Sequence, residues 1–302
     1  MNLAERLVET AEHFGPVLAT VDGYDVIDCR ACGFRHIDPL LSDEELQKFY
    51  DGEFYEKERP DYFARAEADK EWWMLRYHHY YELLEAHAPG RRILDIGSGP
   101  GYFLEAGRMR GWDVLGFEPS RIAAEYTAGR GIAVVNGFFS ADKAQGPFDV
   151  ISMNLVLEHL RDPIGLVEQA KSVLAPGGLL FVSSPNDFNP LQMVLWRKMG
   201  FAPWWVVPKH HLNYFDHESA KRFFTARGLK TLHQEASYPL ENFLLAGRNY
   251  VGNETVGRQC HAERKAFETA LFRHDKEQIK ALAASWSAQG IGREFIILGQ
   301  KP

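Results

Sequence analysis

The residues with the clearest chemical use are three glycines and two acids. Gly97, Gly99 and Gly101 occupy alternate positions directly after an apolar segment that contains Asp95, and Glu118 ends the next apolar segment. Glycine has no Cβ, so a backbone turn built from it can come close to a ligand. A carboxylate about twenty residues beyond such a turn can accept hydrogen bonds from ribose hydroxyls. The pattern therefore predicts a site for a cofactor that contains adenosine.

The spacing of the glycines distinguishes between two classes of cofactor. A dinucleotide site uses G-x-G-x-x-G, whose glycines meet a pyrophosphate at a helix N-terminus. Here the spacing is G-x-G-x-G, and Tyr102 stands where a dinucleotide motif has its third glycine. Asp95 would repel a pyrophosphate, but it suits the amino group and sulfonium of S-adenosylmethionine. The residues expected to bind this cofactor around the turn are Asp95, Gly97, Ser98, Gly99, Pro100, Gly101 and Tyr102.

Three stretches resemble the motifs of one enzyme family. Residues 93–103 carry the glycine turn, residues 148–163 read FDVISMNLVLEHLRDP, and residues 174–185 read LAPGGLLFVSSP. In this order they resemble class I S-adenosylmethionine-dependent methyltransferases, and the close resemblance covers residues 92–228. It implies an enzyme with an α/β, Rossmann-like fold. The implied sheet has seven mostly parallel strands, with strand seven antiparallel between strands five and six.

The resemblance also implies cofactor contacts at the ends of the later strands. These are Glu118 and Pro119 after strand two, Phe138 after strand three, and Asn154 and Leu155 after strand four. Many relatives have an acid near the position of Phe138 that holds the adenine amino group. Here adenine would be held by backbone groups and by aromatic or apolar contact.

A long helix is predicted over residues 61–88, where aromatic side chains recur near helical spacing. In related folds this leading segment covers the methionine end of the cofactor. Tyr55, Trp73 and Tyr77 are the candidates for that position. The alternative is that they only pack the helix against the sheet.

Composition limits the class of partner. The chain has 302 residues and a formal net charge of −7, and it has no basic tract, which disfavours nucleic acid as the substrate. No apolar run approaches the ~18 residues that would indicate a membrane span. The start of the chain lacks a signal-peptide pattern, and three cysteines do not suggest a disulfide framework. We expect a cytoplasmic protein that acts on a small molecule.

Three parts are expected along the chain. Residues 1–60 form an irregular leader with one hairpin, residues 61–236 and 291–302 form the methyltransferase domain, and residues 237–290 form a mostly helical insertion. The insertion and the long connection over 185–214 both begin at the carboxyl edge of the sheet, where ligands bind in open α/β sheets. We expect both to build the acceptor pocket. The alternative is a homodimer interface, which exposed tryptophans would also suit.

The leader carries a single C-x-x-C pair, Cys29 and Cys32. It resembles bacterial methyltransferases with an N-terminal zinc ribbon, many of which act on sugars. That pattern needs a second pair upstream, and residues 1–28 contain no cysteine. A structural zinc site takes four ligands. The side chains that could complete a set are His13, His36, Cys260 and His261, but their spacing does not support it. We expect a degenerate ribbon with two free thiols and no bound metal.

Methyl transfer needs an acceptor held in line with the methyl group, and a hydroxyl acceptor is helped by a general base. Histidine suits this role near neutral pH. His159 follows strand four closely, and His210 and His211 stand at the mouth of strand five, with Tyr214 as a possible partner. His210 and His211 are preferred over His159, for which a structural role is the alternative.

The sequence predicts methyl transfer to a small polar molecule. O-methylation of a sugar, a nucleotide-linked sugar or a capsule-type metabolite is favoured by the zinc-ribbon resemblance and by the histidines. N- or C-methylation of an aromatic or natural-product metabolite is the second reading. A non-catalytic module that binds S-adenosylmethionine is the third, although Asp95, Glu118 and the glycines are intact.

Overall fold

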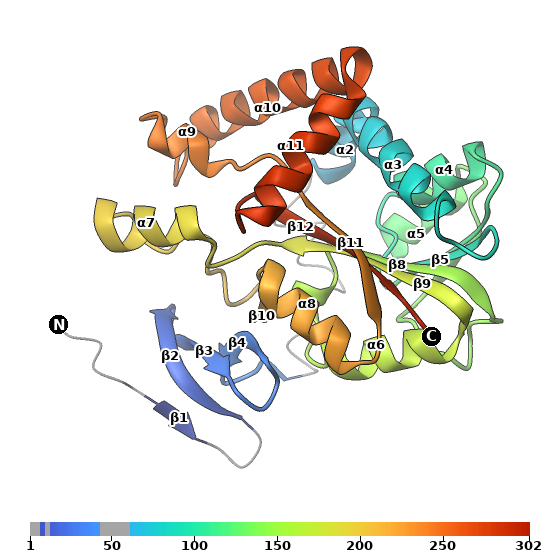
Figure 1. Cartoon of the computed structure of the whole chain (residues 1–302), viewed down its shortest axis with the longest axis horizontal. Coiled ribbons are helices and arrows are strands. Elements are labelled where there is room, and N and C mark those ends of the chain that lie inside the picture. The colour runs from blue at the N-terminus through green and yellow to red at the C-terminus, as the bar shows by residue number, and fades with distance from the viewer. Residues whose placement is uncertain (1–6, 10–12, 43–60) are drawn as a thin grey trace.

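A seven-stranded sheet forms the centre of the molecule (Figure 1). The computed structural model describes residues 7–9, 13–42 and 61–302. In sheet order the strands are β11 (Lys230–Ala236), β12 (Glu294–Gln300), β9 (Leu174–Pro185), β8 (Phe148–Asn154), β5 (Arg92–Ile96), β6 (Asp113–Glu118) and β7 (Val134–Asn136). β12 is antiparallel to both of its neighbours, whereas the strands from β9 to β7 pair in parallel. The predicted fold is therefore confirmed, including the position of strand seven.

Helices cover both faces of this sheet, so its central strands bury apolar side chains on both sides. Ile93 and Leu94 are adjacent on β5 and both fully buried, yet they belong to different clusters. Ile93 packs with α3 (Lys70–Glu85) and α4 (Tyr102–Met109), and Leu94 packs with α6 (Pro163–Ser172) and α8 (His217–Ala226). The remaining elements of this part are α2 (Tyr62–Ala68), α5 (Arg121–Ala128) and the 3₁₀ turn η2 (Leu157–His159). Among the described residues, none of the helices combines the length and apolarity that crossing a membrane requires.

The insertion before β12 is helical, as predicted. It consists of α9 (Glu241–Leu245), α10 (Glu254–His274) and α11 (Lys276–Ala288). α11 packs on β11, and α10 lies beside α3 at the upper edge of the molecule in Figure 1. The insertion therefore returns over the carboxyl edge of the sheet instead of extending away from it.

The described part of the leader is a sheet, which corrects the expectation of an irregular segment with one hairpin. Its strands are β1 (Leu7–Glu9), β2 (Phe14–Val21), β3 (Tyr24–Cys29), β4 (Phe34–Asp38) and β10 (Asn213–Tyr214). All neighbours are antiparallel. β10 comes from the connection after β9, so a segment far away in the sequence completes this sheet.

The connection over 185–214 packs against this N-terminal sheet. It contains α7 (Pro190–Met199) and β10. Its aromatic side chains join a separate core, whose buried members are Ala19, Val26, Ile37, Leu41, Phe188, Trp205, Val206, Leu212 and Tyr214. The tryptophans that the sequence suggested for a pocket or an interface therefore serve a second core.

Candidate active site

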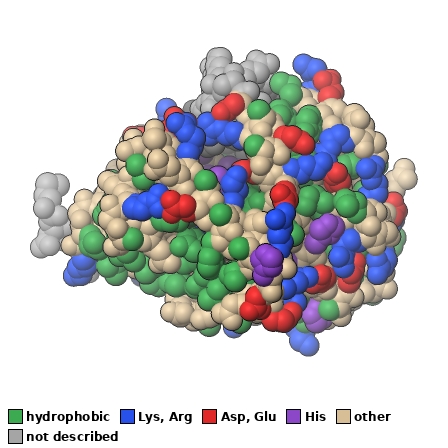
Figure 2. Space-filling model, turned by 90° about the horizontal axis from the view of Figure 1, so that it is seen from above, with side chains coloured by type: hydrophobic (Ala, Val, Ile, Leu, Met, Phe, Trp, Pro, Cys, Tyr) green, Lys and Arg blue, Asp and Glu red, His purple; other side chains and the backbone are tan. Residues whose placement is uncertain are grey.

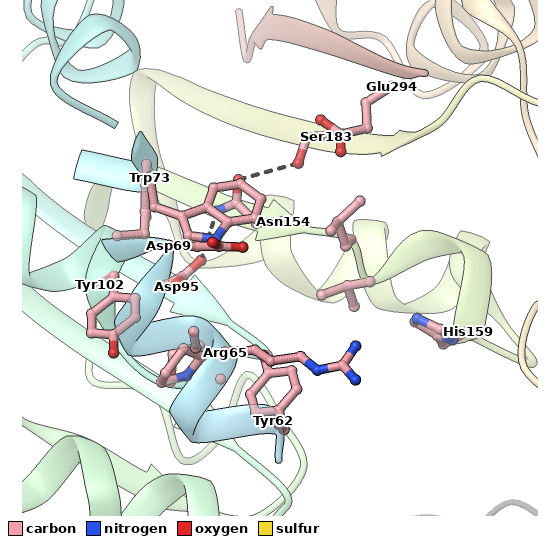
Figure 3. A pocket seen from close by; sticks show the side chains of 18 of the residues that line it. Tyr62, Arg65, Asp69, Trp73, Asp95, Tyr102, Asn154, His159, Ser183 and Glu294 are labelled. Carbon is pink, nitrogen blue, oxygen red and sulfur yellow. Dashed lines mark hydrogen bonds between the residues drawn. The ribbon is translucent and has the colours of Figure 1, made fainter. Parts of the chain in front are cut away.

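A cavity of about 1180 Å³ lies at the carboxyl ends of β5, β6 and β8. Its walls come from the glycine turn, from α10, and from α2 and α3, whose Tyr62, Arg65 and Trp73 are labelled in Figure 3. This is the edge at which open α/β sheets bind their ligands. Of the two segments expected to form the pocket, the helical insertion lines this cavity, and the connection over 185–214 does not.

The turn after β5 has the backbone that its glycines predict. Gly97 and Gly101 have φ values of +72° and +73°, in the left-handed region. A Cβ at Gly97 would lie 2.8 Å from Val156 Cγ2, and one at Gly101 would lie 2.6 Å from Thr127 Cγ2. Both positions therefore need glycine for conformation and for space. Ser98, Gly99 and Pro100 line the cavity between them.

Glu118 joins the turn to the end of β6. Its two carboxylate oxygens accept hydrogen bonds of 2.8 Å from the backbone N–H groups of Gly99 and Ser120. Burial raises the pKa of this carboxyl above its ordinary value. A carboxylate offers about four lone-pair sites, so two bonds leave capacity for ribose hydroxyls. The position on the cavity wall fits the predicted role.

Asp95 lies deep in the cavity beside Asn154 (Figure 3). Its Oδ1 accepts hydrogen bonds from Ser152 Oγ at 2.6 Å and from Asn154 Nδ2 at 3.3 Å. Ser183 Oγ in turn donates to Asn154 Oδ1 at 3.2 Å. Burial raises the pKa of Asp95 to about 7. A buried carboxyl with this pKa gains from a cationic partner, so the site suits the positive charges of S-adenosylmethionine.

Aromatic side chains from the leading helices form the wall opposite this carboxyl. Trp73 and Tyr77 line the cavity as predicted, and their rings stack with centroids 5.5 Å apart. Tyr55, the third candidate, lies outside the described residues. Tyr102 donates a 2.7 Å hydrogen bond to Glu67, which ties α4 to α2. These contacts hold an apolar wall over the end of the site where Asp95 lies.

The remaining predicted cofactor residues also lie on the cavity. Pro119, Phe138 and Leu155 line it, and Phe138 remains 54% exposed. Leu155 has a φ of +56°, and its N–H donates to the carbonyl of Ser183 at 2.9 Å. An exposed aromatic ring on a cavity wall is suited to contact with a flat base such as adenine.

One face of α10 forms the far wall of the cavity. Its lining residues are Asn253, Glu254, Gly257, Arg258, His261, Ala262 and Lys265. Lys265 pairs with Asp69, and His261 Nε2 donates to the same carboxyl at 2.7 Å. The sequence predicted that the insertion would help to build the pocket, and the helical spacing of these residues was the signal that could have identified the face that does so.

The four predicted catalytic residues separate into one on the cavity and three away from it. His159 lines the cavity and keeps 25% of its side chain exposed. His210, His211 and Tyr214 lie off the cavity wall in the described part of the chain, which corrects the preference for His210 and His211. Tyr214 is fully buried, and its hydroxyl accepts a 3.2 Å hydrogen bond from the N–H of Val207. The reason is that β10 draws this segment into the N-terminal sheet.

His159 is held in one orientation by its neighbours. Its Nδ1 donates to the carbonyl of His210 at 2.5 Å, since a carbonyl can only accept. The ring of His211 lies 5.1 Å away, centroid to centroid. Burial lowers the pKa of both imidazoles, so both are neutral at neutral pH. His159 therefore presents an unprotonated Nε2.

Glu158 lies behind this ring. Its Oε1 is 3.8 Å from His159 Nε2, and its Oε2 accepts a 2.9 Å hydrogen bond from Ser184. Burial raises the pKa of Glu158 to about 8. The ligand atoms of Glu158, His159 and His211 lie within 4.8 Å of one another, so they could also hold a metal ion, which the sequence did not suggest.

The chain is similar to proteins of one family. Residues 59–234, more than half of the chain, match the methyltransferase domain. The chain belongs to this family. It is 33% identical over 109 residues to the ubiquinone biosynthesis O-methyltransferase of Pseudomonas aeruginosa (strain UCBPP-PA14), covering 33% of this chain and 47% of that protein. A protein of the same name from Paraburkholderia phymatum is 34% identical over 109 residues, with 33% and 47% covered. The chain thus spans about half the length of these curated relatives.

Solved structures show the same fold at low identity. A SAM-dependent methyltransferase from Archaeoglobus fulgidus is 18% identical, with a TM-score of 0.50 over 80% of this chain and 99% of that one. The plantazolicin methyltransferase BpumL, solved with a substrate analogue and SAH, is 14% identical, with a TM-score of 0.51 over 85% and 96%. The predicted enzyme class is confirmed at the level of the family: the chain carries a methyltransferase domain. S-adenosylmethionine is the cofactor of the family, and Asp95, Glu118 and the glycine turn fit it.

Proposed function

We propose that this methyltransferase transfers a methyl group from S-adenosylmethionine to a hydroxyl of a small polar acceptor, with His159 as general base. The observation that carries the proposal is that one cavity holds Asp95 and Glu118 together with an unprotonated imidazole nitrogen. In Figure 3, Trp73 and Asp95 lie together at one end of the pocket, and His159 lies at the other. The cofactor and the acceptor would meet between them.

The reaction requires the protein to position the cofactor and the acceptor and to accept one proton. When bound, S-adenosylmethionine supplies an electrophilic methyl group. The thioether that leaves needs no acid catalysis. As the acceptor oxygen forms its bond to carbon, its proton passes to Nε2 of His159. The hydrogen bond from Nδ1 to the carbonyl of His210 fixes the tautomer that this step requires. The aromatic wall of α3 excludes water from the same space.

For the acceptor, we propose a sugar, a nucleotide-linked sugar or a capsule-type metabolite. The support is the polar wall of α10, where charged and amide side chains face the cavity and can bind several hydroxyls. An aromatic acceptor is the second candidate. It is favoured by the stacked rings of Trp73 and Tyr77 and by relatives that are named for ubiquinone biosynthesis.

We also propose that the partners of the protein include neither nucleic acid nor a membrane. Lys and Arg side chains alternate with Asp and Glu on the face seen in Figure 2, without a surface of one sign. Such a surface lacks the basic stripe that follows a phosphate backbone. A homodimer stays a prediction, and the exposed apolar side chains Val194 and Met199 on α7 offer it a surface.

A methyl-transfer assay with two acceptor panels tests the proposal. The purified protein is incubated with isotopically labelled S-adenosylmethionine and with either sugars and nucleotide sugars or catechols and phenols. We expect S-adenosylhomocysteine and an O-methyl product from one panel, identified by mass. Tight cofactor binding without turnover on any hydroxyl acceptor, but with turnover on amines, would overturn O-methylation.

A further inference from the structure

Four potential metal ligands converge at one end of the N-terminal sheet, on elements that do not line the cavity. They are His13, Cys29, Cys32 and His36, and their ligand atoms all lie within 4.8 Å of one another. His13 Nδ1 is 3.4 Å from Cys32 Sγ and 3.8 Å from Cys29 Sγ. The sequence named both histidines as possible partners of the cysteine pair, but the spacing alone gave no reason to choose them.

The two distances from His13 to the cysteine sulfurs match a tetrahedral zinc site. Zinc binds sulfur at about 2.3 Å and imidazole nitrogen at about 2.0–2.1 Å, so its ligand atoms lie roughly 3.3–3.8 Å apart. The distances of 3.4 Å and 3.8 Å fall within that interval. The set of two thiolates and two imidazoles is one that zinc uses in structural sites.

A hydrogen bond to the backbone orients His36 as a possible ligand. Its Nδ1 donates to the carbonyl of Ile37 at 2.7 Å, which leaves the lone pair on Nε2. That Nε2 is buried and makes no hydrogen bond, and His36 as a whole is only 2% exposed. A buried polar atom without a partner is costly. Metal-bound histidines are typically held by such a hydrogen bond from the other ring nitrogen.

The turn between β3 and β4 brings the two sulfurs to the same side. Gly33 has a φ of +78°, and its N–H donates to the carbonyl of Cys29 at 2.9 Å. This closes a tight turn over the C-x-x-C pair. The two cysteines form no disulfide. Buried thiols that served only packing would not need two imidazole rings, and the rings of His13 and His36 have centroids 4.7 Å apart.

We propose that His13, Cys29, Cys32 and His36 bind one Zn²⁺ ion as a structural site. All four positions are filled by protein, so no open position is left for a substrate, as expected for a structural site. The ion would join the start of β2, the end of β3 and the middle of β4. His36 pairs with Asn213 of β10 in the sheet register, so the ion also stabilises the segment that carries His210 and His211.

Elemental analysis of tag-free protein, purified without added metal, tests the site directly. We expect about one zinc per chain, lost in Cys32→Ser and His13→Gln. The matched control is Cys260→Ser, since Cys260 is a buried free thiol on α10, outside the cluster, and its loss should leave the zinc in place. A cobalt-substituted wild type should show thiolate-to-metal charge transfer and the visible bands of a tetrahedral site.

Two results would overturn the proposal. The first is folded wild-type protein that holds less than about a tenth of a zinc ion per chain and gives no charge-transfer band with cobalt. The second is zinc that persists in both the Cys32→Ser and His13→Gln variants, because the ligands would then lie elsewhere. Both measurements use the wild type or single variants and are independent of any methyl-transfer activity.

Discussion

The sheet side and the helical side of the cavity are built in different ways. On the sheet side, Asp95 and Glu118 are joined to the glycine turn and to neighbouring strands by hydrogen bonds between the sheet and its loops. On the helical side, α2, α3 and α10 meet through side chains, such as Asp69 with His261 and Lys265. The sheet side depends on backbone geometry that a short motif encodes. The helical side depends on contacts between helices almost two hundred residues apart, so it can vary while the sheet side is kept.

Removing the proposed base should have the largest effect. His159→Ala should lower turnover by roughly 10²–10⁴, because it removes the proposed acceptor of the hydroxyl proton, while affinity for S-adenosylhomocysteine stays within a few-fold. In the wild type, the acidic limb of kcat/KM should have its midpoint below ~6.5, since burial lowers the pKa of His159. Steady-state rates measure turnover and its pH dependence, and calorimetric titration measures the affinity for S-adenosylhomocysteine. The control is His87→Ala, an exposed histidine after α3. Full turnover in His159→Ala would assign the proton transfer elsewhere.

A change at the cofactor end should instead reduce binding. Glu118→Ala removes an acceptor for ribose hydroxyls and also frees the N–H of Gly99, which shapes the turn. Hydrogen bonds to charged groups contribute ~1.5–3 kcal/mol each, so affinity for S-adenosylhomocysteine should fall by at least roughly tenfold. Calorimetric titration measures this loss, and Glu125→Ala on the exposed side of α5 is the matched control. Unchanged affinity in Glu118→Ala would contradict the cofactor assignment.

The pH dependence of cofactor binding should identify Asp95. Its pKa is raised from 3.8 to about 7 by burial, so the carboxyl is protonated below that pH and then attracts a cation less. Affinity for S-adenosylmethionine should therefore fall roughly tenfold from pH 8 to pH 6. The Asp95→Asn variant should bind S-adenosylmethionine weakly, with an affinity that does not change over this pH range. The control variant Asp142→Asn changes an exposed residue and should follow the wild type. A wild-type affinity that does not change with pH would remove Asp95 from this role.

The same shift predicts how stability depends on pH without cofactor. Between 3.8 and about 7, the folded protein keeps a proton on Asp95 that the unfolded chain releases. The contribution of Asp95 to the free energy of unfolding therefore falls as the pH rises through this window. Thermal unfolding of wild type and Asp95→Asn at several pH values isolates this contribution, which the variant should lack.

The parts that sequence predicted are those whose signal is local. β8 (Phe148–Asn154) begins the motif over residues 148–163, because a buried parallel strand is an apolar run between turns. Asp95 and Glu118 follow from the position of an acid at a strand end. The N-terminal sheet was missed because β10 comes from residues that read as a loop. His13 and His36 could not be joined to the cysteine pair from spacing, since strand pairing alone brings them together.

The smallest expected effect comes from the contact that joins the start of α3 to α10 over the cavity. Burial acts to raise the pKa of Asp69, but Lys265 and His261 outweigh it and hold the pKa below its ordinary value. The carboxylate is thus charged at neutral pH and joins the start of α3 to α10. Asp69→Asn should weaken this junction and raise KM for the acceptor a few-fold, because ion pairs at partly exposed sites contribute only ~1 kcal/mol.

Affinity for S-adenosylhomocysteine should not change in this variant, since the carboxylate of Asp69 pairs with His261 and Lys265 of α10 and, among the described residues, not with Asp95, Glu118 or the glycine turn. The matched control is Glu277→Gln, which removes an exposed carboxyl on α11 away from the cavity. Steady-state kinetics against acceptor, with cofactor saturating, separates the two constants. If Asp69→Asn instead lowered cofactor affinity and left the acceptor KM unchanged, Asp69 would serve the cofactor site and not the acceptor site.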